Sequence, residues 1–123
     1  MYKSSVIIFL VLAILFAGVH IFALAASLYW YLWWFDIMMH AWGGVLLVLG
    51  VHVFSTFSWL PIRSNWPTIL TVLFIATVSW EIFEWSIGLY DPETYVFDTT
   101  KDIVVGFSFG VLAQLYLRRN SIK

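Results

Sequence analysis

Three pairs of ionisable side chains have the spacing that places two residues on one face of a helix. The pairs are Asp36 with His40, Glu81 with Glu84, and Asp98 with Asp102. Carboxylate oxygen and imidazole nitrogen are suited to Mg, Mn, Zn or Fe, and the absence of cysteine excludes thiolate ligands. These six residues are therefore candidate ligands of a divalent metal ion, provided that their helices meet.

The same side chains also suit catalysis. Glu81 or Glu84 could act as a general base with His40 as an acid or a metal ligand, so these three residues are the catalytic candidates. Asp36 could orient the His40 imidazole by a hydrogen bond, as carboxylates often do around metals. The sequence leaves these uses open.

Structural explanations stand beside the chemical ones. Glu81 and Glu84 could hold helices together by hydrogen bonds to Thr77 or to Tyr and Trp side chains. Asp98 or Asp102 could instead cap the last helix, because an acid is favourable near the positive end of the helix dipole. Neither explanation excludes a metal site.

The elements that must position these residues are strongly apolar. Of the 123 residues, 63% are hydrophobic, 20% aromatic and 11% charged, which is more apolar than soluble domains are. The expected fold is all-α: a single-domain polytopic membrane protein with a bundle of four transmembrane helices at about 6–28, 36–57, 67–90 and 101–117. The lipid bilayer is the expected partner, and a net charge of −1 argues against nucleic acid.

Basic residues predict the orientation in the inner membrane. Threading the four spans puts five of them on one side: Lys3, Arg63, Arg118, Arg119 and Lys123. Lys101 alone falls on the other side, so both termini should face the cytoplasm. The seven acids then lie in the outer half or the outer loops, where one lysine against seven acids leaves a formal charge of −6. Protons, a divalent cation, a cationic ligand or a basic partner subunit must compensate that charge.

Glycines predict where the helices approach one another. Gly43 and Gly44 follow His40, and Gly106 and Gly110 continue the helix face that begins at Asp102. Small residues at such spacing allow two backbones to pack closely. That packing would bring the polar pairs together. His20 should lie in the same half of the membrane and His52 near the cytoplasmic end.

Three ordered segments resemble a known family. They read FDIMMH at 35–40, WEIFEW at 80–85 and DTTKD at 98–102, with Gly106 following. Together they resemble the uncharacterised inner-membrane family typified by YjdF and, more distantly, VanZ-like membrane proteins. YjdF-like proteins are generally longer with more spans, and VanZ-like proteins usually carry Glu-x-x-Gln where this chain has Glu81 and Glu84. The resemblance implies the architecture and nominates these residues, but it implies no reaction.

Four functions follow as hypotheses from this pattern. The first is a site in the outer half of the bilayer that binds a divalent cation or a cationic ligand. The second is a membrane-embedded hydrolase or transferase that acts on a lipid or a lipid-linked head group. The third is an accessory subunit with a basic membrane partner, and the fourth is an ion or proton transporter, which would need a homo-oligomer because four helices are few.

Overall fold

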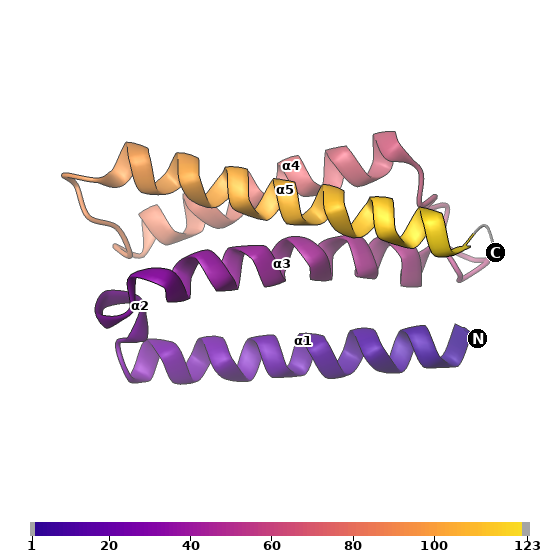
Figure 1. Cartoon of the computed structure of the whole chain (residues 1–123), viewed down its shortest axis with the longest axis horizontal. Helices are drawn as coiled ribbons and strands as arrows, with labels where there is room; N and C mark the ends of the chain where they lie inside the picture. Colours follow the sequence, from indigo (N-terminus) through magenta and orange to yellow (C-terminus); the bar gives the residue numbers. More distant parts are fainter. Residues whose placement is uncertain (1, 122–123) are drawn as a thin grey trace.

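The chain folds into helices that lie side by side. The structure, a computed structural model, describes the backbone of residues 2–121 and the side chains of residues 4–120. Within that range the elements are α1 (Tyr2–Ala25), α2 (Leu28–Tyr31), α3 (Trp33–Phe54), α4 (Trp66–Ser86) and α5 (Tyr95–Ser121). The N- and C-terminal ends of the chain lie at the same end of the bundle (Figure 1). The all-α prediction is confirmed.

In the part of the chain that the structure describes, three helices are long and apolar enough to cross a membrane. These candidate spans are Ser4–Ala25, Trp33–Phe54 and Trp66–Ser86. The fourth predicted span is helical, but α5 is not among them because polar residues such as Asp102 and Gln114 interrupt its apolar sequence. Both of these side chains are buried in the bundle. Because both side chains are buried in the bundle, α5 can carry these polar residues and still pack along the other helices.

Local backbone signals set the ends of the helices. Asn65 caps α4, because its Oδ1 accepts a hydrogen bond from the Thr68 N–H at 3.1 Å, and Pro67 occupies the first turn. The same helix ends at Ser86 rather than near 90. Two residues beyond that end, Gly88 adopts the left-handed backbone conformation (φ 79°). The largest difference is in α5, which begins at Tyr95 rather than near 101.

The central helix of the bundle is α3, which packs most extensively against α5 and also contacts α1 and α4. A Cβ atom added at Gly44 would collide with the carbonyl oxygen of Gly106, so the two backbones touch at this point. The close approach predicted from the glycines is therefore confirmed. It sets the helix turn that carries His40 beside the turn that carries Asp102.

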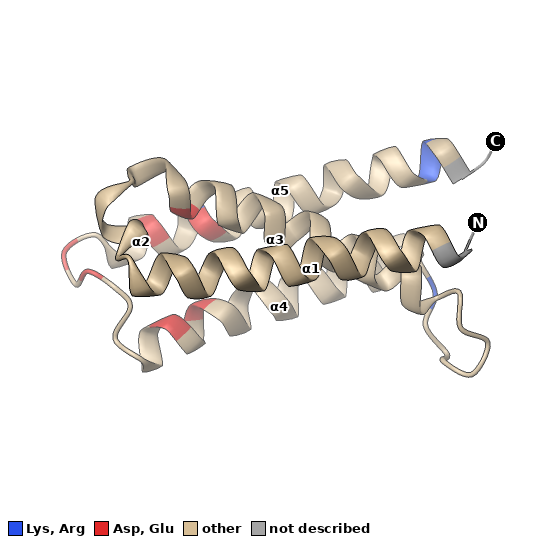
Figure 2. Ribbon diagram, turned by 90° about the horizontal axis from the view of Figure 1, so that it is seen from below, with Lys and Arg blue, Asp and Glu red and all other residues tan. Residues whose placement is uncertain are grey.

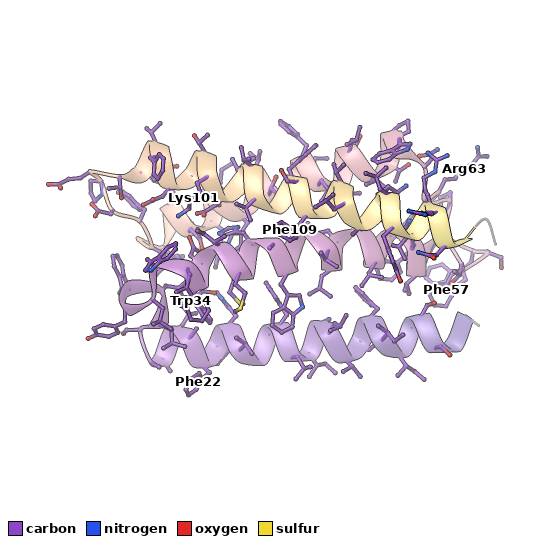
Figure 3. All side chains as sticks on the ribbon, in the orientation of Figure 1. Phe22, Trp34, Phe57, Arg63, Lys101 and Phe109 are labelled. Carbon is purple, nitrogen blue, oxygen red and sulfur yellow. The ribbon has the colours of Figure 1, made fainter. Side chains whose placement is uncertain are left out.

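An apolar core lies in the half of the bundle toward the termini. Val48 and Val51 of α3 pack against Ile69 and Leu73 of α4, and each of the four is buried. The outer surface is apolar as well: Phe22 is 64% exposed and points away from the bundle (Figure 3). Such a surface suits lipid contact rather than water.

Charges separate along the long axis of the bundle. Figure 2 shows the acidic residues toward the end formed by α2 and the loop between α4 and α5, with basic residues at the end that holds the termini. Lys101 lies with the acids, whereas Arg63 lies at the opposite end (Figure 3). We call the two ends the acidic end and the terminal end.

Candidate metal centre

One imidazole nitrogen stands at the centre of the acidic end. Nε2 of His40 lies 3.3 Å from Asp36 Oδ1, 3.4 Å from Asp102 Oδ2 and 3.9 Å from Glu81 Oε1. The carboxylates come from α3, α5 and α4, respectively. The three helices therefore converge on His40, and the contact between Gly44 and Gly106 holds two of them at the required separation.

Four residues can each direct one ligand atom to a common point. His40, Glu81, Glu84 and Asp102 offer ligand atoms that all lie within 4.8 Å of one another, and we call these four residues the His40 cluster. Donor atoms bound at about 2.0–2.2 Å from one cation lie roughly 3.0–3.6 Å apart. Small side-chain movements would bring the four atoms to that spacing.

Burial of the carboxylates in the His40 cluster is energetically unfavourable unless a positive charge compensates them. Glu81 is 6% exposed and Asp102 is 3% exposed. Within the described part of the chain, Glu81 Oε1 and Asp102 Oδ1 are buried without a hydrogen-bond partner, although Lys101 Nζ lies 3.8 Å from the latter. Buried polar atoms are normally paired, so these two oxygens mark a place where a cation or a proton is needed.

Asp36 and Asp98 do not join the His40 cluster, although both are predicted ligands. Asp36 contacts the same His40 nitrogen that faces Glu81 and Asp102, so it does not orient the ring through the other nitrogen. The Asp98 side chain is 42% exposed, accepts a hydrogen bond from Thr94 Oγ1 at 2.6 Å and pairs with Lys101 at 3.8 Å.

The first turn of α5 explains the place of Asp98. Because α5 begins at Tyr95, Asp98 lies near the positive end of the helix dipole, as the structural alternative predicts. Asp102 lies one turn further along, inside the bundle, and faces His40. The sequence predicts a helix start near 101, which puts Asp98 and Asp102 both close to that start. For this reason the sequence could not distinguish the roles of the two acids.

Hydrogen bonds also bear on the structural explanation for the two glutamates. Trp80 Nε1 donates to Glu84 Oε1 at 3.0 Å, so a Trp contact exists for Glu84. Thr77 Oγ1 instead donates to the backbone carbonyl of Leu73 at 2.6 Å. The indole satisfies one oxygen of Glu84 and leaves the other free of that bond, so the contact does not exclude a metal ligand role.

Neither of the other histidines enters the His40 cluster. His20 Nδ1 forms a 2.7 Å hydrogen bond with the Tyr29 hydroxyl, and the His20 ring lies edge-on to Trp80 with centroids 5.4 Å apart. His52 lies near the terminal end, as predicted, and its Nε2 is 2.6 Å from Gln114 Oε1.

Sequence reasoning missed the importance of Gln114. Its side chain is fully buried, contacts His52 and donates from Nε2 to the Ser64 carbonyl at 3.2 Å. It joins α5 to α3 and to the loop before α4. A single amide in an otherwise apolar stretch of the last helix was the signal that could have identified it.

Two cavities share walls at the candidate metal centre. A polar pocket of about 340 Å³ opens at the acidic end and includes Glu81, Glu84 and Asp102 in its walls. A larger apolar cavity of about 570 Å³ extends from there toward the terminal end, and His40 lines it. Tyr29, Asp36 and Glu84 border both. Tyr29 is thus a wall of the site.

Comparison with known proteins places the chain in a family. The model of the family described as "Predicted membrane protein (DUF2238)" matches residues 2–122. The chain belongs to this family. Membership establishes a membrane protein and agrees with the resemblance to YjdF-like proteins, but the family description names no reaction. No curated protein and no solved structure matches the chain.

Proposed function

We propose that this membrane protein binds a divalent cation through His40, Glu81, Glu84 and Asp102. The observation that carries the proposal is the pair of buried oxygens without a hydrogen-bond partner, Glu81 Oε1 and Asp102 Oδ1, beside a group of four convergent ligand residues. A cation at their common point would satisfy both oxygens at once. Imidazole with carboxylates fits Mn, Zn or Fe well, and Mg by its carboxylates.

The charge of the site supports a bound cation over a purely structural role of its carboxylates. Asp36, Glu81, Glu84 and Asp102 carry four negative charges against one positive charge on Lys101, a formal balance of −3 with His40 neutral. A charged side chain inside a bilayer costs on the order of 2.5–3.5 kcal/mol on insertion scales. A bound divalent cation would reduce the imbalance to −1 while using the His40 nitrogen as a ligand.

The membrane arrangement belongs to the same proposal. We place α5 in the membrane as a fourth span, because it lies along α3 and the termini share one end of the bundle (Figure 1). Basic residues at the terminal end then favour cytoplasmic termini in the inner membrane. The His40 cluster would lie in the outer half of the bilayer.

Metal titration of the purified protein tests the cation site. Protein stripped with a chelator should take up about one Mn²⁺ or Zn²⁺ per chain and become more resistant to heat, because the ion binds the folded state. Glu81→Gln and Asp102→Asn keep the side-chain shape and should weaken binding about tenfold or more. Glu93→Gln, in the exposed α4–α5 loop, is the matched control and should bind like the wild type.

Two results would contradict the cation site. One is a wild-type protein that binds no more Mn²⁺ or Zn²⁺ than the Glu81→Gln/Asp102→Asn double variant. The other is a wild-type protein whose resistance to heat no divalent metal raises, which is what purely structural carboxylates predict. Size-exclusion profiles of each variant would show that it remains folded.

A lipid-modifying enzyme is the second candidate, and the polar pocket favours it. The pocket brings open space of about 340 Å³ to Glu81 and Glu84, which are the candidate bases of a hydrolase or transferase. Lipid profiles of cells that lack the protein should then match those of cells carrying Glu84→Gln and differ from the wild type. Identical profiles in all three strains would remove this function.

The remaining hypotheses have less support. A proton or ion path from the His40 cluster to the terminal end would pass the apolar cavity and the core of Val48, Val51, Ile69 and Leu73, whose walls are mainly apolar. An accessory subunit would use its acidic end to bind a basic membrane partner or a second copy. Acid-to-amide changes would then release the partner without altering the metal content. The VanZ-like likeness remains a prediction.

A further inference from the structure

The apolar cavity has the size and shape for an aliphatic chain. Its volume of about 570 Å³ falls in the range of about 300–1,000 Å³ that is typical of small-molecule sites. Along α3 its walls extend from Asp36 to Phe54, eighteen residues apart, which corresponds to roughly 27 Å at 1.5 Å per residue. Phe9 and Ala13 of α1 and Ala76 of α4 complete the walls.

The polar pocket provides space for a head group at the end of that chain. Tyr29, Asp36 and Glu84 border both spaces, so one molecule can have its apolar part in the cavity and its polar end in the pocket. Lys101 lines the pocket and is the single basic residue among its walls. Its ammonium lies 3.8 Å from Asp98 and from Asp102, next to the His40 cluster.

We propose that the occupant is a lipid phosphate whose chain lies in the apolar cavity and whose phosphate binds the cation of the His40 cluster together with Lys101. This inference rests on the proposed cation site and names the chemical class of its ligand. Divalent cations held by few carboxylates commonly take phosphate oxygens as further ligands. A phospholipid and an isoprenoid phosphate share this chemistry.

Electrostatics makes the phosphate dependent on the cation. Asp36, Glu81, Glu84 and Asp102 would repel an anionic head group, and Lys101 alone does not offset four carboxylates. A bound divalent cation supplies the missing positive charge. The two ligands should therefore bind cooperatively, and by linkage each tightens the other by the same factor. A lipid amine would behave in the opposite way, because it would compete with the cation for the carboxylates.

Mn²⁺ titration with matched twelve-carbon amphiphiles tests the inference on the full chain in neutral-lipid nanodiscs. Dodecyl phosphate should lower the Mn²⁺ dissociation constant about fivefold or more. Dodecanol should leave it unchanged. Farnesyl phosphate and dioleoyl phosphatidic acid distinguish the two kinds of lipid phosphate. A larger effect of farnesyl phosphate on Mn²⁺ affinity indicates an isoprenoid phosphate, whereas a larger effect of dioleoyl phosphatidic acid indicates a two-chain phospholipid.

Four variants distinguish binding of the aliphatic chain from binding of the head group. Ala13→Trp or Ala76→Trp fills the apolar cavity and should abolish the effect of dodecyl phosphate while Mn²⁺ alone binds as in the wild type. Ile14→Trp is the matched control, because that residue is 69% exposed on the outer surface, and it should keep the effect. Lys101→Gln should reduce the effect without weakening Mn²⁺ alone.

The outcomes distinguish the two proposals. No Mn²⁺ binding by the wild type would overturn the cation site and, with it, this inference. Mn²⁺ binding that dodecyl phosphate does not change would overturn the lipid phosphate alone. If dodecyltrimethylammonium weakens Mn²⁺ binding and dodecyl phosphate has no effect, the lipid phosphate is overturned in favour of a lipid amine. An effect that persists in both Ala13→Trp and Ala76→Trp would place the aliphatic chain outside the apolar cavity.

Discussion

The contact between Gly44 and Gly106 should decide whether the candidate metal centre can assemble. In Gly44→Ala the new Cβ would overlap the Gly106 carbonyl oxygen, and neither atom can rotate away because the helix backbones fix both positions. The helices α3 and α5 would have to separate by on the order of 1 Å to restore normal contact. The His40 side chain, one turn from Gly44, would move away from Asp102.

The size of this effect follows from two opposing contributions. Overpacking of a tight contact costs about 1–3 kcal/mol, and a rigid backbone partner favours a value near about 3 kcal/mol. Replacing glycine by alanine within a helix returns about 1 kcal/mol at most. The free energy of unfolding should therefore fall by about 2 kcal/mol, roughly a 30-fold change in the ratio of folded to unfolded protein.

Gly43→Ala is the matched control on the same helix. A Cβ at Gly43 would lie 3.7 Å from the Phe16 ring, which is ordinary contact, so this variant should be as stable as the wild type or up to about 1 kcal/mol more stable. Unfolding equilibria in mixed micelles, followed by tryptophan fluorescence, measure both variants. Mn²⁺ affinity should fall in Gly44→Ala only. Equal stability and equal affinity of the two variants would refute the proposed role of this contact.

Two further predictions concern buried contacts. Gln114→Leu should lower the free energy of unfolding by about 1–3 kcal/mol in the same assay, because it leaves His52 and the Ser64 carbonyl without their partner. The control is Leu115→Ala, at a position that is 52% exposed. An equal loss of stability in the control would argue against the hydrogen bonds of Gln114. Gly110→Ala should cost about 1–3 kcal/mol, because the new Cβ would lie 2.5 Å from Leu73 Cδ2. Adding Leu73→Ala should give a double variant that loses less than the sum of the two single losses, whereas strict additivity would contradict the contact.

Much of the fold could be predicted because its signals are local. The start of α4 follows from Asn65 and Pro67, and its apolar length follows from composition. The early start of α5 could not be read in the same way. The loop acids and the threonines at 94–100 suit either a turn or the first turn of a helix, and the choice depends on what the helix packs against.

The candidate site was predicted in part. His40 and Glu81 could be nominated because a charged or imidazole side chain at membrane depth is costly and therefore needs a reason. Gln114 and Tyr29 were not singled out because an uncharged amide or phenol costs less to bury than a charged side chain. Their roles arise from neighbours on other helices: Gln114 meets His52 across the bundle, and Tyr29 borders both cavities.

The amino-acid sequence by itself determined that this is an apolar, helical membrane protein with its acids gathered toward one end, because hydrophobicity and charge belong to each residue wherever it lies. Only the tertiary structure decided which acids meet. Asp102 reaches His40 and Asp98 does not, although both share one helix face, because the backbone contact of Gly44 with Gly106 sets how closely and at what level α5 meets α3. That register depends on packing between residues far apart in the chain, and no local pattern encodes it.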